Sequence, residues 1–244
     1  MLVTWNISSM ANFNNLLLLI TKYQPETICL QETKCLKFPE IDGYFCFGSA
    51  FPRSQHHGVA IYTKVESRQI PLLEELRGHA IAIMQGETLI VNVYVKNSGQ
   101  SLDARKIFDS LLWGEIARIS TKSMIIAGDF NVCVDLDDHH LGKINEKQAG
   151  LESYCKDFIA EMISKYNLLD TYKICNYEEH GKKYKWTFKT RRYGNKEDVA
   201  DVIEQGRNNG LWRLDYIFTT HEIFNSSATL LDIRGSDHVP VMAH

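Results

Sequence analysis

The sequence predicts an α+β fold in which β-sheets are covered by a few helices. Strand-like runs outnumber helical runs and often follow one another directly, which does not fit a simple alternation of strand and helix. Apolar residues make up 44% of the 244 residues, enough for a substantial core. Because neither an internal repeat nor a linker is found, residues 1–244 are expected to form a single domain.

Strands are expected where short runs of β-branched and aromatic residues end in polar or turn-forming residues. These runs are residues 2–5, 27–30, 58–63, 79–84, 89–94, 123–127, 214–219 and 240–243. A further segment, 183–189, alternates basic and aromatic residues with the period of two of a half-exposed strand.

Helices are expected at residues 13–22, 103–119 and 148–166, where apolar residues recur every three or four positions. The side chains expected to face the core are Leu16, Leu17 and Ile20 in the first helix, Ile107, Leu111, Leu112 and Ile116 in the second, and Phe158, Met162 and Ile163 in the third. The longest loops are expected at 133–147 and 190–211, and such loops often help to grip a substrate.

The composition also bears on location. No stretch approaches the ~20 uncharged apolar residues of a membrane span, so no membrane association is expected. The first residues lack the basic and apolar regions of a secretory signal. Six scattered cysteines without metal-site spacing are expected to be thiols in a reducing compartment. An intracellular location, in the nucleus or the cytoplasm, follows.

Charge is distributed unevenly along the chain. The net charge of −3 argues against a general nucleic-acid binder, but residues 180–196 hold seven Lys or Arg and no acid, which leaves −3 − 7 = −10 for the rest. This segment suits a phosphate-contacting edge, with Lys185, Lys189 and Arg191 as candidate contacts. A solvated hairpin face would explain the charge equally well. The interleaved aromatics, Trp186 among them, are expected mainly in the core.

Polar residues at strand ends form the candidate site. They fall in five strings, 4–6, 30–34, 128–131, 212–216 and 235–238, which only folding can bring together. The strings supply one His, several carboxylates and two Asn, a combination suited to metal-assisted phosphoryl transfer.

Each of these residues has an ordinary alternative role. Glu32 could hold a divalent ion, although a Glu taken alone is more often a surface carboxylate. Asp129 could take a proton from water beside Asn131, or the two could simply form a turn. His238 could stabilise charge on a phosphate if a carboxylate, for which Asp215 is the candidate, fixes its tautomer. Trp212 could face a substrate or pack in the core with equal ease.

Seven motifs in order resemble the endonuclease/exonuclease/phosphatase superfamily. They are W-N (5–6), Q-E-T-K (31–34), G-V-A-I-Y-T-K (58–64), N-V-Y-x-x-N-S-G (92–99), G-D-F-N (128–131), W-R-L-D-Y (212–216) and G-S-D-H-x-P (235–240). The resemblance covers residues 2–241. Within the superfamily, the sequence is most similar to the exonuclease III branch of apurinic/apyrimidinic endonucleases.

The resemblance implies a four-layer α/β sandwich, with two mainly antiparallel β-sheets flanked by helices. It also implies Mg²⁺-dependent phosphodiester hydrolysis, with Mn²⁺ able to substitute. By position, it assigns metal binding to Glu32, Asn6 and Asp237, catalysis to Asp129, Asn131, His238, Asp215 and Tyr94, and substrate binding to Asn97, Trp212, Leu214 and Trp186.

The implied function is cleavage 5′ to abasic sites in double-stranded DNA by a monomer that acts in base excision repair, with 3′-5′ exonuclease or 3′-phosphodiesterase work as an accompanying activity. The sequence departs from the family pattern at Ser8, where Asn or Asp is usual, at residues 9–11, at Lys96 and in the longer 190–211 loop. These departures keep open a catalytically impaired nucleic-acid-binding module. A target-nicking endonuclease domain of a non-LTR retrotransposon also stays open, because the strings G-D-F-N-V-x-V-D-L-D (128–137) and Y-K-W-T (184–187) resemble such domains as much as repair enzymes.

Overall fold

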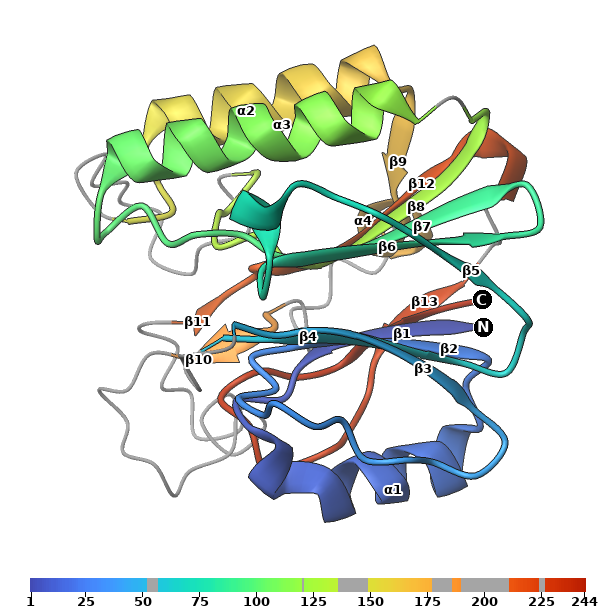
Figure 1. The fold of residues 1–244 in the computed structure, drawn as a ribbon. Helices are drawn as coiled ribbons and strands as arrows, with labels where there is room; N and C mark the ends of the chain where they lie inside the picture. The colour runs from blue at the N-terminus through green and yellow to red at the C-terminus, as the bar shows by residue number, and fades with distance from the viewer. Residues whose placement is uncertain (52–56, 120, 136–148, 177–185, 190–210, 224–226) are drawn as a thin grey trace.

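Two β-sheets stacked face to face form the centre of the molecule (Figure 1). The computed structural model describes all residues except 52–56, 120, 136–148, 177–185, 190–210 and 224–226. Helix α1 covers the outer face of one sheet, while α2 and α3 lie together over the outer face of the other (Figure 1). The helix, sheet, sheet, helix order confirms the predicted four-layer sandwich.

The first sheet has the strand order β13-β14-β1-β2-β4-β3. Its strands are β1 (Leu2–Asn6), β2 (Thr27–Gln31), β3 (Phe45–Ser49), β4 (Val59–Thr63), β13 (Ala228–Leu230) and β14 (Val241–Ala243). Only β1 and β2 pair in parallel, and α1 (Phe13–Tyr23) connects them. Both strands therefore end at the same edge of the sheet.

The second sheet has the order β5-β6-β7-β8-β12-β9. Its strands are β5 (Arg68–Ile70), β6 (Ala80–Gln85), β7 (Thr88–Tyr94), β8 (Ser123–Asp129), β9 (Leu168–Asp170) and β12 (Asp215–Thr220). Here β7 and β8 are the parallel pair, connected by α2 (Leu102–Arg118). The remaining elements are α3 (Ser153–Lys165), α4 (Thr171–Cys175), a short ribbon of β10 (Phe188–Lys189) and β11 (Leu211–Trp212), and 3₁₀ turns at Met10–Asn12, Glu74–Leu76 and His221–Ile223.

The helices lie where they were predicted, but some of their predicted core residues are wrong. Leu17 is 39% exposed because α1 contacts its sheet through Leu16 and Leu19, and Ile107 is 62% exposed. The buried stripe of α2 contains the ion pair of Arg105 and Asp109 (2.8 Å), a polar pair that an apolar pattern cannot reveal. Phe158 and Ile163 in α3 are only partly buried, and this helix begins five residues later than predicted.

Several strands were not predicted at all. Strands β3, β5, β9 and β13 lie at the edges of the sheets, and three of them have only three residues, so they carry little periodic signal. The strand predicted at 183–189 is described only as Phe188–Lys189, and the loops predicted at 133–147 and 190–211 lie mostly outside the described residues. Lys189 is buried, which contradicts its predicted outward position.

Two expectations from composition can be compared with the fold. All six cysteines are in the described part of the chain, and they form no disulfide bond. Among the described residues, no helix combines the length and the apolar content that crossing a membrane would require.

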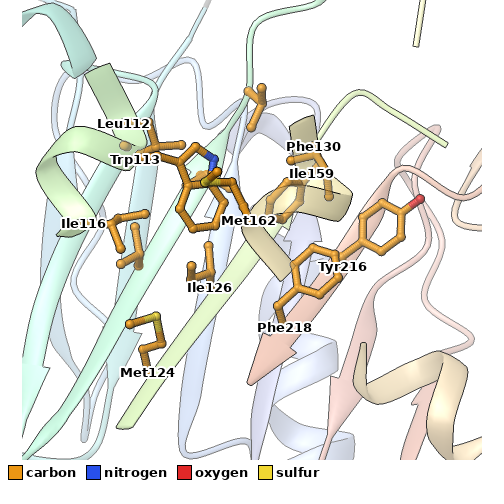
Figure 2. Packing of buried hydrophobic residues seen from close by; sticks show 14 of the residues in the cluster. Leu112, Trp113, Ile116, Met124, Ile126, Phe130, Ile159, Met162, Tyr216 and Phe218 are labelled. Atoms are coloured by element: carbon orange, nitrogen blue, oxygen red, sulfur yellow. The ribbon is translucent and has the colours of Figure 1, made fainter. Parts of the chain in front are cut away.

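The largest core lies between the second sheet and its two helices. Figure 2 shows Leu112, Trp113 and Ile116 of α2, with Ile159 and Met162 of α3, packed over strands β8 and β12. Phe130, Tyr216 and Phe218 form an aromatic group in this core, with ring centroids 5.1–5.7 Å apart. A second core lies under α1, and a third fills the space between the sheets.

A buried amide pair crosses between the sheets. Gln31 Nε2, at the end of β2, donates to Asn92 Oδ1 of β7 at 2.7 Å. Asn92 Nδ2 in turn donates to the carbonyls of Leu30 and Ala60 at 2.9 and 2.8 Å. Both side chains are fully buried, where water cannot reach their polar atoms, so these hydrogen bonds take the place of bonds to water.

Replacing Asn92 with Ala should destabilise the fold, because it removes these three bonds and leaves the buried carbonyls of Leu30 and Ala60 without the Asn92 donor. We expect the free energy of unfolding in urea to fall by roughly 2–4 kcal/mol. Asn14→Ala, on the exposed face of α1, is the matched control and should change stability by less than about 0.5 kcal/mol. Equal effects of the two substitutions would contradict a role for the pair.

Candidate active site

The ends of strands from both sheets converge at one end of the sandwich. In the second sheet, Asp129 pairs in register with Tyr94 on one side and Asp215 on the other. From the first sheet, Asn6 ends β1, and Glu32 directly follows β2. Paired residues present their side chains to the same face, so the register alone brings the carboxylates together.

The side chain of Asn6 connects the two sheets at this point. Its Nδ2 donates to Glu32 Oε1 at 3.0 Å and to Asp129 Oδ2 at 2.9 Å. The backbone N–H of Ser8 donates to Asn6 Oδ1 at 3.0 Å, which fixes the orientation of the amide. Asn6 was predicted as a metal ligand. The nitrogen of its side-chain amide, a hydrogen-bond donor, faces Glu32 and Asp129. The role of Asn6 as a metal ligand therefore stays a prediction.

His238 is held by Asp215. Its Nδ1 donates to Asp215 Oδ2 at 2.8 Å, and its Nε2 lies 3.8 Å from Asp129 Oδ2. Nε2 also lies 3.4 Å from Asn6 Nδ2, but a protonated Nε2 and an amide nitrogen are both donors and cannot bond. The Nε2 proton is therefore available to an incoming acceptor. The Phe188 ring packs on the imidazole with a centroid distance of 4.8 Å.

Neighbouring charges set the protonation of this group. Burial lowers the pKa of His238, but Asp215 and Asp129 outweigh it and raise the pKa to about 10. Burial and the charge of Asp215 raise the pKa of Asp129 to about 7, against the opposing effect of His238. A cationic imidazole beside a carboxylate that accepts protons near neutral pH is suited to acid–base chemistry on a phosphate.

Glu32 and Asp237 present oxygen ligands beside this pair. Burial alone would raise the pKa of Glu32, but Lys34, at 2.7 Å, and Asn6 lower it, so the carboxylate is ionised. Asp237 Oδ1 accepts from Ser8 Oγ at 2.5 Å. Hard carboxylate oxygens of this kind fit Mg²⁺. Asp129, Asp215 and His238 also offer ligand atoms within 4.8 Å of one another, but His238 Nδ1 is already bonded to Asp215, which makes that trio a poor ion site.

The remaining predicted catalytic residues also border the site. Burial, followed by the charges of Glu32 and Asp129, raises the pKa of Tyr94 far above its usual value, so the phenol stays a neutral donor. Asn131 Nδ2 donates to the Val95 carbonyl at 2.8 Å, and its Oδ1 accepts from Asn97 Nδ2 at 3.4 Å. These two amides therefore form the wall of the site next to Tyr94.

The predicted substrate-binding residues have mixed outcomes. Trp212 and Leu214 are 5% exposed each and pack with Cys133 and Leu151, next to Phe188. Trp186 is equally buried, as its predicted core position required. Their substrate roles, and that of the buried Lys189, stay predictions. Lys185 and Arg191 lie outside the described residues.

Three supporting residues escaped the sequence reasoning. Thr187 Oγ1 accepts from the N–H groups of Leu214 and Asp215 at 3.0 and 3.1 Å, which positions the partner of His238. Ser236 Oγ donates to the Asn6 carbonyl at 2.7 Å and accepts from His238 N–H at 3.1 Å. Phe188 is one of the interleaved aromatics of residues 183–189, which were expected mainly in the core although such aromatics can also stack on bases. The G-S-D-H string contained the signal for Ser236, whereas nothing in the sequence singled out Thr187.

This fold and site define the class of protein. The family model described as Endonuclease/Exonuclease/phosphatase family matches residues 3–238, and the chain belongs to that family. The match confirms the resemblance found in the sequence.

Two curated relatives cover nearly the whole chain. Recombination repair protein 1 of Drosophila melanogaster is 29% identical over 262 residues, which are 98% of this chain but 36% of that protein. A DNA-(apurinic or apyrimidinic site) endonuclease of Dictyostelium discoideum is 27% identical over 266 residues, 98% of this chain and 69% of that protein. The chain thus spans only about a third of the Drosophila relative.

Solved structures share the same fold. An AP endonuclease from Leishmania major superposes with a TM-score of 0.81 at 22% identity, over 100% of this chain and 87% of the other. A 3′ phosphatase from Neisseria bound to a product DNA hairpin has a TM-score of 0.81 at 19% identity, over 100% and 98%.

The raised pKa of His238 predicts how stability depends on pH. Because the folded value, about 10, exceeds the ordinary 6.5, the pairing stabilises the fold fully below pH 6.5, and the stabilisation is lost as pH rises through about 10. Replacing Asp215 with Asn should lower the His238 pKa by at least about one unit in an NMR titration of metal-free protein. Asp232→Asn, at an exposed position, should leave it unchanged. A pKa that stays in place in Asp215→Asn would contradict the pairing.

Proposed function

We propose that this protein is a Mg²⁺-dependent DNA phosphodiesterase that cuts 5′ to abasic sites and serves base excision repair as a monomeric, single-domain enzyme. The observation that carries the proposal is the convergence of Glu32, Asp129 and His238 on one amide, that of Asn6. A candidate base, a cationic donor and a candidate ion ligand therefore lie close together around this amide, which supports the proposal.

The names of the relatives support DNA as the substrate. One is an endonuclease for apurinic or apyrimidinic sites, one is called a recombination repair protein, and a structural neighbour is bound to a DNA hairpin. The neighbour from Neisseria acts on 3′ phosphates, which fits an accompanying 3′-end activity.

In the proposed reaction, Asp129 accepts a proton from the attacking water. Its raised pKa makes it a stronger base than an ordinary Asp, and the Asn131 N–H, which donates to Asp129 Oδ1 at 2.9 Å, leaves Oδ2 to face the site. The bond between phosphorus and the leaving 3′ oxygen breaks as the bond from the attacking water oxygen to phosphorus forms. The leaving 3′ oxygen takes a proton from solvent water, so the products are a 3′-hydroxyl and a 5′-phosphate.

His238 stabilises the charge that grows on the phosphate. Asp215 keeps Nδ1 protonated and the ring in place, so Nε2–H can donate to a phosphoryl oxygen. Tyr94 and Asn97 add neutral donors on the neighbouring wall of the site. These groups act in a buried setting, where a fixed donor stabilises charge more than water does.

Glu32 and Asp237 are the residues that would hold Mg²⁺, and the ion would supply positive charge to the phosphate oxygens. The donor chemistry of the site is consistent with this, because both side chains offer carboxylate oxygen atoms, both are only partly buried, and Glu32 is ionised.

Selectivity for abasic sites would come from the apolar cluster beside His238. Phe188 is only partly buried, packs on His238 and is backed by the buried Trp212 and Leu214, so this cluster would give a sugar without a base an apolar contact. Turning a nucleotide out of the duplex costs a few kcal/mol, and the cost is lowest where no base has to be unstacked.

The deciding experiment uses two end-labelled duplexes, one with a single tetrahydrofuran abasic analogue and one undamaged, each incubated with Mg²⁺ or EDTA. We expect one Mg²⁺-dependent cut 5′ to the analogue. Preferred nicks in the undamaged duplex would favour a target-nicking endonuclease instead. DNA binding without any cut would point to a binding module.

The same assay tests the proposed ion ligand. Glu32→Gln keeps the shape and the bond to Asn6 but removes the charge, so the Mg²⁺ concentration at half-maximal rate should rise by at least about tenfold. Glu26→Gln, at an exposed position close by in sequence, is the matched control and should leave it unchanged.

Asp129→Asn removes the proposed base while keeping a side chain of the same shape. We expect kcat on the abasic duplex to fall by roughly 10²–10⁴-fold with little loss of DNA affinity. Asp157→Asn, on the exposed face of α3, should cut normally. Normal turnover by Asp129→Asn would show that another group takes the proton.

A further inference from the structure

A row of side chains crosses the second sheet at the level of the site. The strand register places Asp215 beside Asp129 and Asp129 beside Tyr94. On the far side of Tyr94, its N–H donates to the carbonyl of His79 at 2.6 Å, one residue before β6 begins. His79 is therefore the next member of the row. The other three belong to the proposed active site, whereas His79 has no part in the chemistry described above.

His79 contacts Tyr94 through both its backbone and its ring. The imidazole Nδ1 lies 2.8 Å from the Tyr94 carbonyl oxygen, and because that oxygen can only accept, Nδ1 must carry the proton. The two rings are stacked, with centroids 5.6 Å apart and planes 10° apart. Phe108 of α2 meets the His79 ring edge-on at 5.5 Å. The tyrosine is thus tied to the helix layer through His79.

The burial of His79 leaves it no surface for direct contact with DNA. Its side chain is only 4% exposed. Burial lowers its pKa to about 4, and the charges of His57 and Lys96 add to this, although the bond to Tyr94 opposes it. At neutral pH the ring is uncharged, and its Nδ1–H is committed to Tyr94.

Tyr94, in contrast, belongs to the proposed active site. It pairs in register with Asp129 on the neighbouring strand β8, so the two side chains lie on the same face of the sheet. The ring is held at its other side by His79, so a change there would move the hydroxyl relative to Glu32 and Asp129.

We propose that His79 is a positioning residue that holds the ring and carbonyl of Tyr94, so that the tyrosine hydroxyl meets the phosphate beside Glu32 and Asp129. The catalytic consequence rests on the proposed function, whereas the placement of Tyr94 can be tested without it.

Three variants test the kinetic consequence. His79→Leu removes the donor and the stacked ring, and kcat should fall by roughly 10–100-fold, the scale of loss from a misplaced group, with a smaller change in KM. His79→Asn puts an amide nitrogen near the place of Nδ1 and should recover most of that loss. His221→Leu, at an exposed position, is the matched control.

A double-mutant cycle separates positioning through Tyr94 from a general structural role. In a Tyr94→Phe background, which already lacks the hydroxyl, His79→Leu should cost less than about threefold in kcat. An equal loss in both backgrounds, or no loss in His79→Leu alone, would overturn the proposal. Melting temperatures measured in parallel show whether a variant has simply unfolded.

A readout independent of catalysis keeps the test decisive even if no DNA is cut. In protein labelled with 3-fluorotyrosine, the ¹⁹F resonance of Tyr94 is the one that disappears in Tyr94→Phe. This resonance should shift or split in His79→Leu and return towards the wild-type position in His79→Asn. An unchanged resonance in His79→Leu would overturn the proposal, whereas absence of cleavage by the wild type would overturn only the proposed function.

Discussion

The hydrogen bond between Gln31 and Asn92 fixes the distance between the two sheets next to the site. Gln31 directly precedes Glu32, and Asn92 lies two residues before Tyr94 on the same face of β7. A bond of 2.7 Å between the two buried amides therefore determines how far Glu32, the proposed ion ligand, lies from the opposite sheet. If one sheet shifts slightly against the other, apolar contacts between them persist. A buried amide pair, in contrast, loses its hydrogen bonds and cannot replace them with bonds to water. The geometry of the proposed chemistry depends on this pair.

The site itself is costly for the fold. Asp129, Asp215 and His238 are all buried, and removing charges from water is unfavourable unless they compensate one another. Ser8, Glu32 and Asn131 also adopt positive φ angles of 50–60°, a region that residues other than glycine rarely occupy. The surrounding hydrogen bonds, such as that from Ser8 N–H to Asn6, keep these residues in place. These buried charges and strained backbone angles therefore lower the stability of the folded state, while the surrounding bonds hold the polar side chains of the site in a fixed arrangement.

Sequence reasoning succeeded where a strand end and a polar string coincide. The meeting of Asn6, Glu32, Asp129 and His238 could be predicted, because each ends or follows a recognisable apolar run and the order of motifs resembles a known family.

Predictions from the sequence failed where tertiary contacts override the periodicity of apolar residues. Ile107 has the spacing of a core residue but is exposed, since a buried ion pair takes part of that stripe. Lys189 is buried in a ribbon that it shares with residues far away in sequence. Thr187 could not be found because its importance lies entirely in two backbone bonds to Leu214 and Asp215.

The pairing of β14 with β1 joins residues that are more than two hundred positions apart, such as Leu2 and Ala243. Figure 1 shows these two ends of the chain side by side in the first sheet. During synthesis on the ribosome, Glu32 and Asp129 emerge long before the segment that carries Asp237 and His238. An incomplete chain would then lack Asp237 and His238, and with them part of the proposed site. The proposed chemistry therefore requires the first sheet to have closed, because the segment that completes this sheet also carries His238.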